Sequence, residues 1–384
     1  MIYLDTAATS PVRREVLEAM WPYLTTEFGN PSSVHAVGES AAAALEDARR
    51  RVARAFEVRA TGVVFTSGGT ESDNLAVKGL ALATPRGRHI VVSAIEHEAV
   101  LRSADYLARH HGFSVSIAAV DARGRVDLET LATLLRPDTT LVSVMHANNE
   151  VGTVQPIGAI ADLAHAVGAL VHTDAVQSAG QLDIRLGEIG VDALTVSGHK
   201  VGAPKGTGAL VLRGRQELEP LLHGGGQERG RRSGTESVAG AVALATALDL
   251  AETERLARQA DVDAAEGELR DAFVTAVLAA TPAARLTGHP TERLPRHASF
   301  LFPGRSGEAI LLELERRGVL SSSGSACAAG RSDASHVLLA LGHSEDDARS
   351  AVRFTWGATT TGAELTAVAA SVARAVEAVE SIGS

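Results

Sequence analysis

The sequence of 384 residues contains one cysteine, Cys327, and three lysines, Lys78, Lys200 and Lys205. A single cysteine excludes a disulfide within the chain, and it cannot by itself hold a structural zinc ion or an iron–sulfur cluster. Three lysines leave few candidates for any chemistry that needs a primary amine. Aromatic residues make up only 3% of the chain, whereas 45% is hydrophobic and 21% is charged. This composition indicates a globular protein large enough for two domains.

The net charge is −10 and the pI is near 5.8, which argues against a surface for nucleic acid or for an anionic membrane. No uncharged apolar stretch reaches the roughly 20 residues that a membrane-spanning helix needs. The first residues, Met1–Asp5, lack the basic and apolar regions of a signal peptide. We therefore expect a cytoplasmic protein that binds neither nucleic acid nor a membrane.

Short β-branched runs alternate with amphipathic or alanine-rich segments from about residue 60 to residue 215. Continuous apolar strands separated by helices are typical of a mostly parallel sheet that is covered on both faces. The sequence therefore predicts an α/β fold. The expected strands are 62–66, 89–93, 113–117, 140–145, 170–174, 192–197 and 208–212, and the expected helices between them include 70–82 and 98–111.

A second pattern begins after a long helical stretch that is expected over 237–280. It predicts a large domain over 16–255 and a smaller α+β domain over 256–384. The N-terminal segment 1–15 is expected to join the smaller domain. The elements expected in the smaller domain are strands at 297–302 and 351–355 and helices at 308–317 and 361–382.

Ligands of open α/β sheets bind beyond the carboxyl ends of the strands, so the residues that follow each strand are candidates for a site. After the strand 62–66 comes Ser67-Gly68-Gly69-Thr70, whose backbone N–H groups at a helix start favour an anion. Taken alone, this turn also fits an ordinary N-capped helix. It has the spacing of neither a dinucleotide fingerprint nor a P-loop.

Lys200 follows another expected strand, in Ser197-Gly198-His199-Lys200, and more glycines come after it. A lysine in this position is well placed to become a desolvated amine with a lowered pKa, as Schiff-base chemistry requires. Ser197 and His199 beside it are further donors for a phosphate. Lys78, on an expected helix, is interpreted as a surface charge.

Asp174 ends the apolar strand 170–174, so its carboxylate is expected to be partly buried and to need a cationic partner. A protonated pyridine nitrogen would serve, and an N-cap is the alternative. His97 also follows a strand, where its ring would either stack on a cofactor or cap a helix. No close-spaced pair such as HExxH occurs, so no metal site is expected. A phosphate-binding turn, a strand-end aspartate and a lysine among glycines together fit pyridoxal 5′-phosphate (PLP).

Cys327 lies among small residues, in Ser323-Gly324-Ser325-Ala326-Cys327-Ala328-Ala329-Gly330. Buried cysteines usually have apolar neighbours at helix or strand spacing, and this one does not. Such a thiol is either a surface residue without a role or a nucleophile.

The chain resembles the cysteine desulfurases of the NifS/IscS type, which are fold-type I PLP-dependent transferases of the class V aminotransferase group. The resemblance implies a mostly parallel central sheet in a large domain, a smaller α+β domain, PLP as cofactor, L-cysteine as substrate and a homodimer. It covers nearly the whole chain and includes Tyr3–Thr9, Phe28–Ser33, Phe65–Asn74, His146–Glu150, Asp174–Ser178, Ser197–Lys200, His223–Gly230, Arg232–Thr235, Ser323–Cys327 and Val352–Phe354.

The resemblance also implies a role for each matching residue. Lys200 would carry the Schiff base and move protons, and Cys327 would take the sulfur as a persulfide and leave alanine. His97 would stack on the pyridine ring and Asp174 would pair with the ring nitrogen. Arg353 would clamp the substrate carboxylate, with Asn149 nearby. The other cofactor-binding residues would be Gly69, Thr70, Asn149, Gln177, Ser197, His199 and, from the other subunit, Thr235.

Several questions stay open at this point. The small residues around Cys327 would form an arm that presents sulfur to an acceptor, either an iron–sulfur scaffold protein or a tRNA thiolation enzyme. Ala334 stands where many members have proline, and the chain stops at Ser384 without the longer C-terminal extension of housekeeping members. A different class V enzyme, such as an aminotransferase or a selenocysteine lyase, would not need Cys327. A catalytically idle scaffold would need neither Lys200 nor Asp174.

Overall fold

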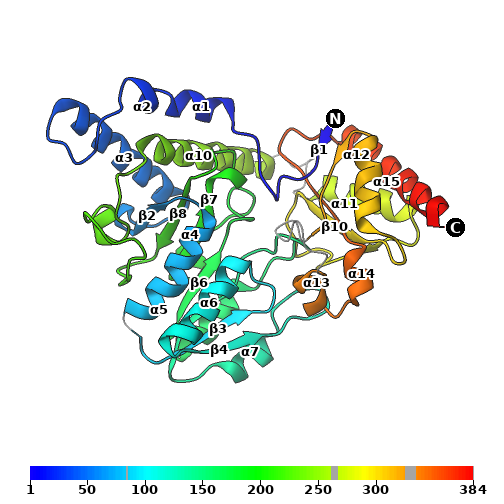
Figure 1. The fold of residues 1–384 in the computed structure, drawn as a ribbon, viewed down its shortest axis with the longest axis horizontal. Coiled ribbons are helices and arrows are strands. Elements are labelled where there is room, and N and C mark those ends of the chain that lie inside the picture. The colour runs from blue at the N-terminus through cyan, green and yellow to red at the C-terminus, as the bar shows by residue number, and fades with distance from the viewer. Residues whose placement is uncertain (84, 261–266, 325–333, 384) are drawn as a thin grey trace.

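A seven-stranded sheet forms the centre of the larger part of the molecule (Figure 1). The structure is a computed structural model and describes residues 1–83, 85–260, 267–324 and 334–383. The strand order is β2-β8-β7-β6-β5-β3-β4, with parallel pairing from β7 to β4 and antiparallel pairing on both sides of β8. The predicted, mostly parallel sheet is therefore confirmed. Its strands are β2 (Val63–Thr66), β3 (His89–Ser93), β4 (Ser114–Ala118), β5 (Thr139–Ser143), β6 (Leu170–Asp174), β7 (Ala193–Ser197) and β8 (Gly208–Leu212).

Neighbouring residues of these strands enter different apolar cores because successive side chains point to opposite faces of a sheet. Val63 belongs to the core on one face and Val64 to the core on the other. The first core is covered by α3 (Ala36–Ala55), α7 (Leu128–Leu134), α8 (Ile157–Ala166) and α10 (Val238–Ala260). The second is covered by α6 (Glu98–His111) and by one helical run of α4 (Gly69–Asn74), a π-helical turn (Leu75–Gly79) and α5 (Leu80–Ala83).

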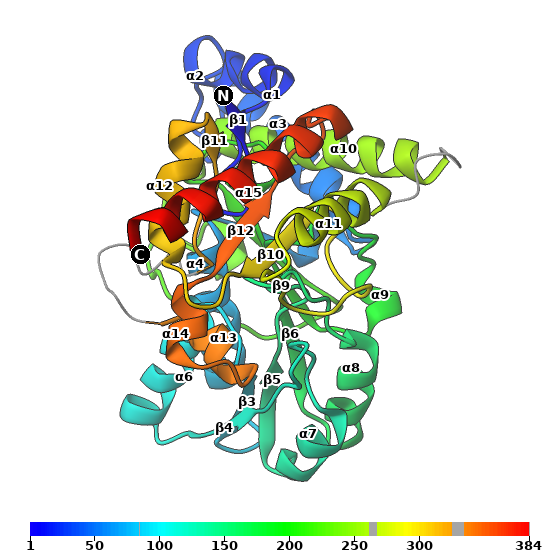
Figure 2. The same cartoon turned by 90° about the vertical axis from the view of Figure 1, so that its right-hand side faces the viewer.

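The smaller part is built on a three-stranded antiparallel sheet with the order β12-β10-β9. Figure 2 shows α15 crossing in front of β12. Phe273, Phe300 and Phe354 meet in the core of this part with edge-on ring contacts. The elements are β9 (Arg285–Leu286), β10 (His297–Leu301), β12 (Val352–Thr355), α11 (Glu268–Ala280), α12 (Gly307–Arg316), α13 (His336–Ala340), α14 (Glu345–Arg349) and α15 (Gly362–Gly383).

The N-terminal segment connects the two parts (Figure 1). β1 (Ile2–Tyr3) pairs in parallel with β11 (Val319–Leu320) of the smaller part, and the chain then continues to α1 (Arg14–Met20) and α2 (Pro22–Thr25) of the larger part. The pairing of β1 with β11 places the first residues beside the smaller part. The predicted domain boundaries themselves stay a prediction.

One expected element is wrong. The stretch 237–280 is not a single helix, because α10 ends at Ala260 and α11 begins at Glu268. Gly267, just before α11, has a φ of 110°, which lies outside the helical region. Alanine-rich composition on both sides predicts helix without showing where such a residue interrupts it. No helix of the described residues is long and apolar enough to cross a membrane.

Candidate active site

A cavity of about 340 Å³ lies where the chain leaves β5, β6 and β7. These strands are parallel, so their carboxyl ends meet at one edge of the sheet. Of the twelve residues that the sequence singled out, ten line this cavity: Gly69, Thr70, His97, Asn149, Asp174, Gln177, Ser197, His199, Lys200 and Arg353. Thr235 does not line it, and Cys327 lies outside the described residues.

The amine of Lys200 is held at the cavity by the N-terminal segment. Lys200 ends a 3-10 turn (Gly198–Lys200) directly after β7. Its Nζ donates to the carbonyl oxygens of Ala7 and Ala8, the second at 2.8 Å. Gly198 is required at the start of this turn, since a Cβ there would lie 2.1 Å from Oγ1 of Thr207. The turn therefore fixes the amine beside the strand ends.

Asp174 lies in a group of buried carboxyl groups beside the cavity. Burial raises the pKa of Asp174, and His97, in its protonated form, and Lys200 oppose that rise. Burial also raises the pKa of Asp73, as does the nearby charge of Asp174. Oδ1 of Asp73 has no hydrogen-bond partner among the described residues. This concentration of acid favours a cationic group in the cavity.

Glu96 belongs to the same acidic region. Its Oε1 accepts from the hydroxyl of Ser93 and from Met145 N at 2.9 Å, and burial raises its pKa to about 8. Sequence reasoning missed both Asp73 and Glu96. Asp73 could have been found from its spacing, because it lies one helical turn after Gly69 and so on the same face. Glu96 precedes His97 directly, but its burial follows only from the packing.

Hydrogen-bond donors for an anion lie at the start of α4 and at the end of β7, in another part of the cavity lining. Gly68 has a φ of 150°, and a Cβ on Gly69 would lie 2.9 Å from Cγ2 of Val176. The first N–H groups of a helix have no partner within the helix. Ser197 and His199 line the cavity too, and burial lowers the pKa of His199 to about 4. The cavity thus offers backbone and side-chain donors that suit a phosphate.

His97 caps a helix, which is one of the two interpretations drawn from the sequence, and its stacking on a cofactor stays a prediction. Its Nδ1 accepts a hydrogen bond from Ala99 N at 3.1 Å and so caps α6, while the ring lines the cavity. With Nδ1 an acceptor, the neutral ring carries its proton on Nε2. Gln177 lines the cavity as well and donates through Nε2 to Ala7 O at 3.1 Å. Its Oε1 lies at the other end of the same amide and accepts hydrogen bonds.

Arg353 of β12 brings a positive charge to the cavity from the smaller part of the molecule. It is 2% exposed, and it donates through Nη2 to Oδ1 of Asp5 at 2.8 Å and through Nη1 to Asn149 O at 2.9 Å. Its Nε has no partner among the described residues. A buried guanidinium with an unused N–H fits a carboxylate ligand. Asp5 was not expected here, because the N-terminal segment reaches β12 only in the folded chain.

The segment that contains Cys327 leaves the described structure at this cavity. Gly324, the last described residue before it, lines the cavity. The chain is described again from Ala334, directly before the N-cap residue Ser335 of α13. The predicted role of Cys327 stays a prediction, and the structure adds where the segment begins and ends.

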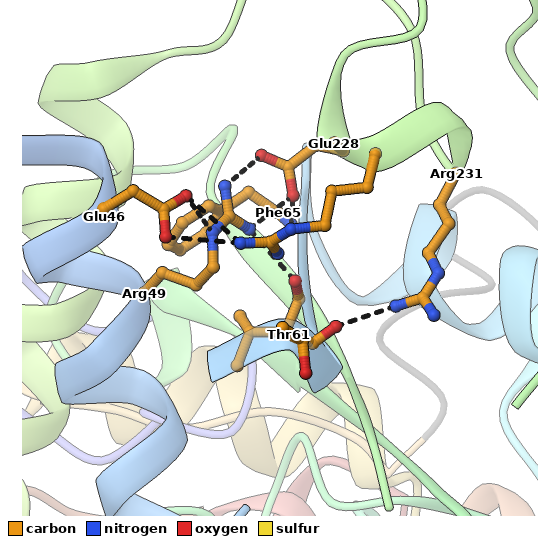
Figure 3. Close-up of polar contacts among 8 residues, drawn as sticks. Glu46, Arg49, Thr61, Phe65, Glu228 and Arg231 are labelled. Atoms are coloured by element: carbon orange, nitrogen blue, oxygen red, sulfur yellow. Dashed lines mark hydrogen bonds and ion pairs between the residues drawn. The ribbon is translucent and has the colours of Figure 1, made fainter. Parts of the chain in front are cut away.

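Thr235 lies in a separate cavity of about 190 Å³, which Ser67 and Arg232 also line. The preceding turn is fixed by a buried ion pair, in which Arg49 donates to both carboxylate oxygens of Glu228 at 2.6 and 2.8 Å (Figure 3). Phe65 N donates to the same carboxylate at 3.0 Å. Glu228 and the next residue have left-handed φ angles of 49° and 59°. The ion pair therefore holds a strained turn against α3 and β2.

Residues 2–368 match the family model described as aminotransferase class-V. The chain belongs to the class-V aminotransferase family. A relative named cysteine desulfurase IscS, from Dictyoglomus turgidum, is 42% identical over 388 residues, which cover 99% of this chain and 96% of the relative. A solved structure described as a NifS-like protein is 35% identical, with a TM-score of 0.89 over 98% of this chain and 99% of its own. Another solved structure, described as "SspA in complex with cysteine", is 35% identical and has a TM-score of 0.78. The match covers 92% of this chain and 98% of that structure.

The class-V enzymes and the cysteine desulfurases among them depend on PLP, and the residues present fit this cofactor. The cavity offers donors at Gly69, Thr70 and Ser197 for the phosphate. The acidic group at Asp174 suits a protonated pyridine nitrogen, and Lys200 supplies an amine for the aldehyde. The chain is therefore a PLP enzyme of the class-V family.

Proposed function

We propose that the protein is a cysteine desulfurase, which converts L-cysteine to L-alanine and carries the removed sulfur as a persulfide on Cys327. The observation that carries the proposal is a single cavity lined by Lys200, Asp174, Arg353 and Gly324. It joins the cofactor residues, a cation for a substrate carboxylate and the start of the Cys327 segment. The relatives named cysteine desulfurase and the solved complex with cysteine support the same substrate.

Each residue contributes a separate task. When bound, PLP supplies an electron sink for bonds at the substrate Cα and Cβ. Lys200 would hold the cofactor and move protons at the substrate Cα, and Asp174 would keep the pyridine nitrogen protonated. His97 would pack against the cofactor ring, and Gln177 would accept a hydrogen bond from the ring hydroxyl through Oε1. Arg353 orients L-cysteine by its carboxylate, beside Asn149.

The sulfur transfer balances without an external oxidant. The thiolate of Cys327 attacks the substrate sulfur, an S–S bond forms and the Cβ–S bond breaks. The electron pair of that bond stays with Cβ, which is protonated to give the methyl group of alanine. The two sulfur atoms are oxidised and the carbon is reduced, so the products are L-alanine and a Cys327 persulfide.

The proposed assembly is a homodimer in which Thr235 of each copy completes the phosphate site of the other. Within one chain Thr235 lies in a cavity apart from the cofactor residues. The strained turn before it is nonetheless held by the buried Arg49–Glu228 pair, which suits a residue presented to a neighbour.

We further propose that the persulfide acceptor is an iron–sulfur scaffold protein or a tRNA thiolation enzyme. A reducing compartment keeps a lone thiol available, so we propose a cytoplasmic enzyme.

Incubation of the purified protein with L-cysteine tests the proposal. We expect stoichiometric persulfide on Cys327, detected by mass spectrometry after alkylation, together with L-alanine. Cys327→Ala should bind PLP and stay yellow, yet form neither product. Alanine release by Cys327→Ala at the wild-type rate would contradict the mechanism and point to a lyase that does not use the thiol.

A further inference from the structure

Both ends of the Cys327 segment meet at one oxygen atom, Oε2 of Glu150. Ser335, which follows the segment, donates its hydroxyl proton to this oxygen at 2.5 Å. Gly324, which precedes the segment, packs so closely that a Cβ there would lie 2.8 Å from the same atom. Glu150 is 5% exposed. A buried side chain of the larger part of the molecule is thus in contact with both ends.

The hydroxyl of Ser335 has only one orientation that satisfies its neighbours. Its oxygen accepts from Leu338 N at 3.2 Å as the N-cap of α13, so its single proton is left for Glu150. The next residue adds a second attachment, because Nε2 of His336 donates to Glu96 O at 3.1 Å. The end of the segment is therefore fixed beside the backbone that precedes His97.

The beginning of the segment is attached to the substrate side of the cavity. Ser322 and Arg353 exchange two backbone hydrogen bonds, at 2.7 and 3.2 Å. Gly324 follows two residues later and lies against the Glu150 carboxylate. A side chain larger than hydrogen at this position would displace the carboxylate and lengthen its bond to Ser335. The close approach therefore favours glycine at this position.

We propose that Glu150 is a positioning residue that ties both ends of the Cys327 segment to the mouth of the cofactor cavity. The proposal rests on the function proposed for Cys327. Because Cys327 is three residues from Gly324, chain length alone keeps its Cα within about 11 Å of that end. An acceptor of the persulfide must therefore approach the mouth of the cavity. With the tie lost, the thiolate spends less time near the substrate sulfur.

The experiment uses Cys327 as its own reporter, since it is the only cysteine of the chain. A nitroxide attached to its thiol reports the motion of the segment by electron paramagnetic resonance, without any turnover. The rate constant of persulfide formation in a single turnover is measured separately on unlabelled, PLP-loaded dimer. The variants are Glu150→Ala, Glu150→Gln and Ser335→Ala. Ser344→Ala is the matched control, because Ser344 caps α14 in the same way without contacting Glu150.

We expect Glu150→Ala to narrow the nitroxide lines and to slow persulfide formation by about tenfold, the scale on which lost positioning of a reactive group acts. The PLP absorbance should not change. Ser335→Ala should act in the same direction, whereas Ser344→Ala should match the wild type. Glu150→Gln retains an acceptor for Ser335 and should keep at least about half of the wild-type rate.

The proposal would be overturned if Glu150→Ala and Ser335→Ala gave the same nitroxide spectra and the same rates of persulfide formation as the wild type. Equal effects of Ser335→Ala and Ser344→Ala would overturn it too, because loss of a helix cap would then explain both. Should Glu150→Ala fail to fold, the comparison of the two serine variants decides alone. If the wild type forms no persulfide, the proposed function fails, and the nitroxide spectra still decide whether Glu150 ties the segment.

Discussion

Glu228 and Glu150 are buried to the same degree, 5% exposed each, but they are held by different partners. Glu228 accepts hydrogen bonds from both terminal nitrogens of Arg49 and fixes the turn before Thr235. Glu150 accepts a hydrogen bond from the neutral hydroxyl of Ser335. A guanidinium that donates two parallel hydrogen bonds neutralises a buried carboxylate and fixes its orientation. A hydroxyl donates one hydrogen bond and brings no opposite charge. The comparison shows two buried carboxylates that attach two segments with very different strength.

The difference agrees with the two proposed tasks. Thr235 has to remain at one place to hold a phosphate of the neighbouring copy, so a rigid, charged pair beneath its turn is an advantage. Cys327 has to meet the substrate sulfur and then an acceptor. A tie through one hydroxyl positions the two ends of its segment and is weaker than an ion pair.

Removal of Arg49 should have the largest effect on stability. Arg49→Met leaves the Glu228 carboxylate buried without its cation, so we expect the free energy of unfolding in urea to fall by about 3–5 kcal/mol. Arg50→Ala, on the same helix, loses only an exposed pair with Asp47 and should cost less than about 1 kcal/mol. The double variant Arg49→Met/Glu228→Gln should recover part of the loss. An Arg49→Met protein as stable as Arg50→Ala would refute this view of the pair.

Gly324→Ala should have an intermediate effect on the other carboxylate. The new methyl group would meet Oε2 of Glu150, and displacement of that oxygen should cost about 1–2 kcal/mol. In a Glu150→Ala background the clash is absent, so the same substitution should cost clearly less. Urea unfolding of the four proteins gives the coupling energy directly. Strict additivity would show that Gly324 and Glu150 do not act on each other.

Reasoning from strand ends identified most of the residues that line the cavity. Lys200 and His97 follow strands that the apolar runs made evident and Asp174 ends one, and parallel strands bring such positions to one edge. The strand limits were close for the same reason: β6 and β8 have the bounds that were expected. The same logic explains why the phosphate turn at Gly69 lies in the cavity.

Residues brought in by tertiary packing could not be found in this way. Asp5 reaches Arg353 from 348 positions away, and nothing in the local sequence indicates that approach. Glu150 lies in a segment that was noticed, but its contact with both ends of the Cys327 segment depends on the docking of the smaller part. Gly267 was only a weak sign of an interruption, because the alanine-rich sequence on both sides of it favours helix.

The smallest of these effects is the pH dependence of stability that Glu150 should cause. Burial raises the pKa of Glu150 above the 4.5 of an exposed glutamate. The folded state therefore binds its proton more tightly than the unfolded state does. The resulting stabilisation is complete below about pH 4.5 and is lost as the pH rises through the raised pKa, at about 1.4 kcal/mol per unit of pKa difference.

Glu150→Gln tests this sign, because an amide does not titrate in this range. The melting temperature of Glu150→Gln relative to the wild type should rise as the pH increases above about 4.5, and it should stay level once the Glu150 carboxyl is ionised in the folded wild type. Glu96→Gln should show the same trend up to about pH 8, since the pKa of Glu96 is raised to about 8. Ser344→Ala, which removes no titrating group, should keep a constant difference from the wild type throughout. A melting-temperature difference for Glu150→Gln that falls with pH would mean that the folded state stabilises the Glu150 carboxylate in its charged form. A flat difference would mean that burial does not raise its pKa. Either result would contradict this prediction.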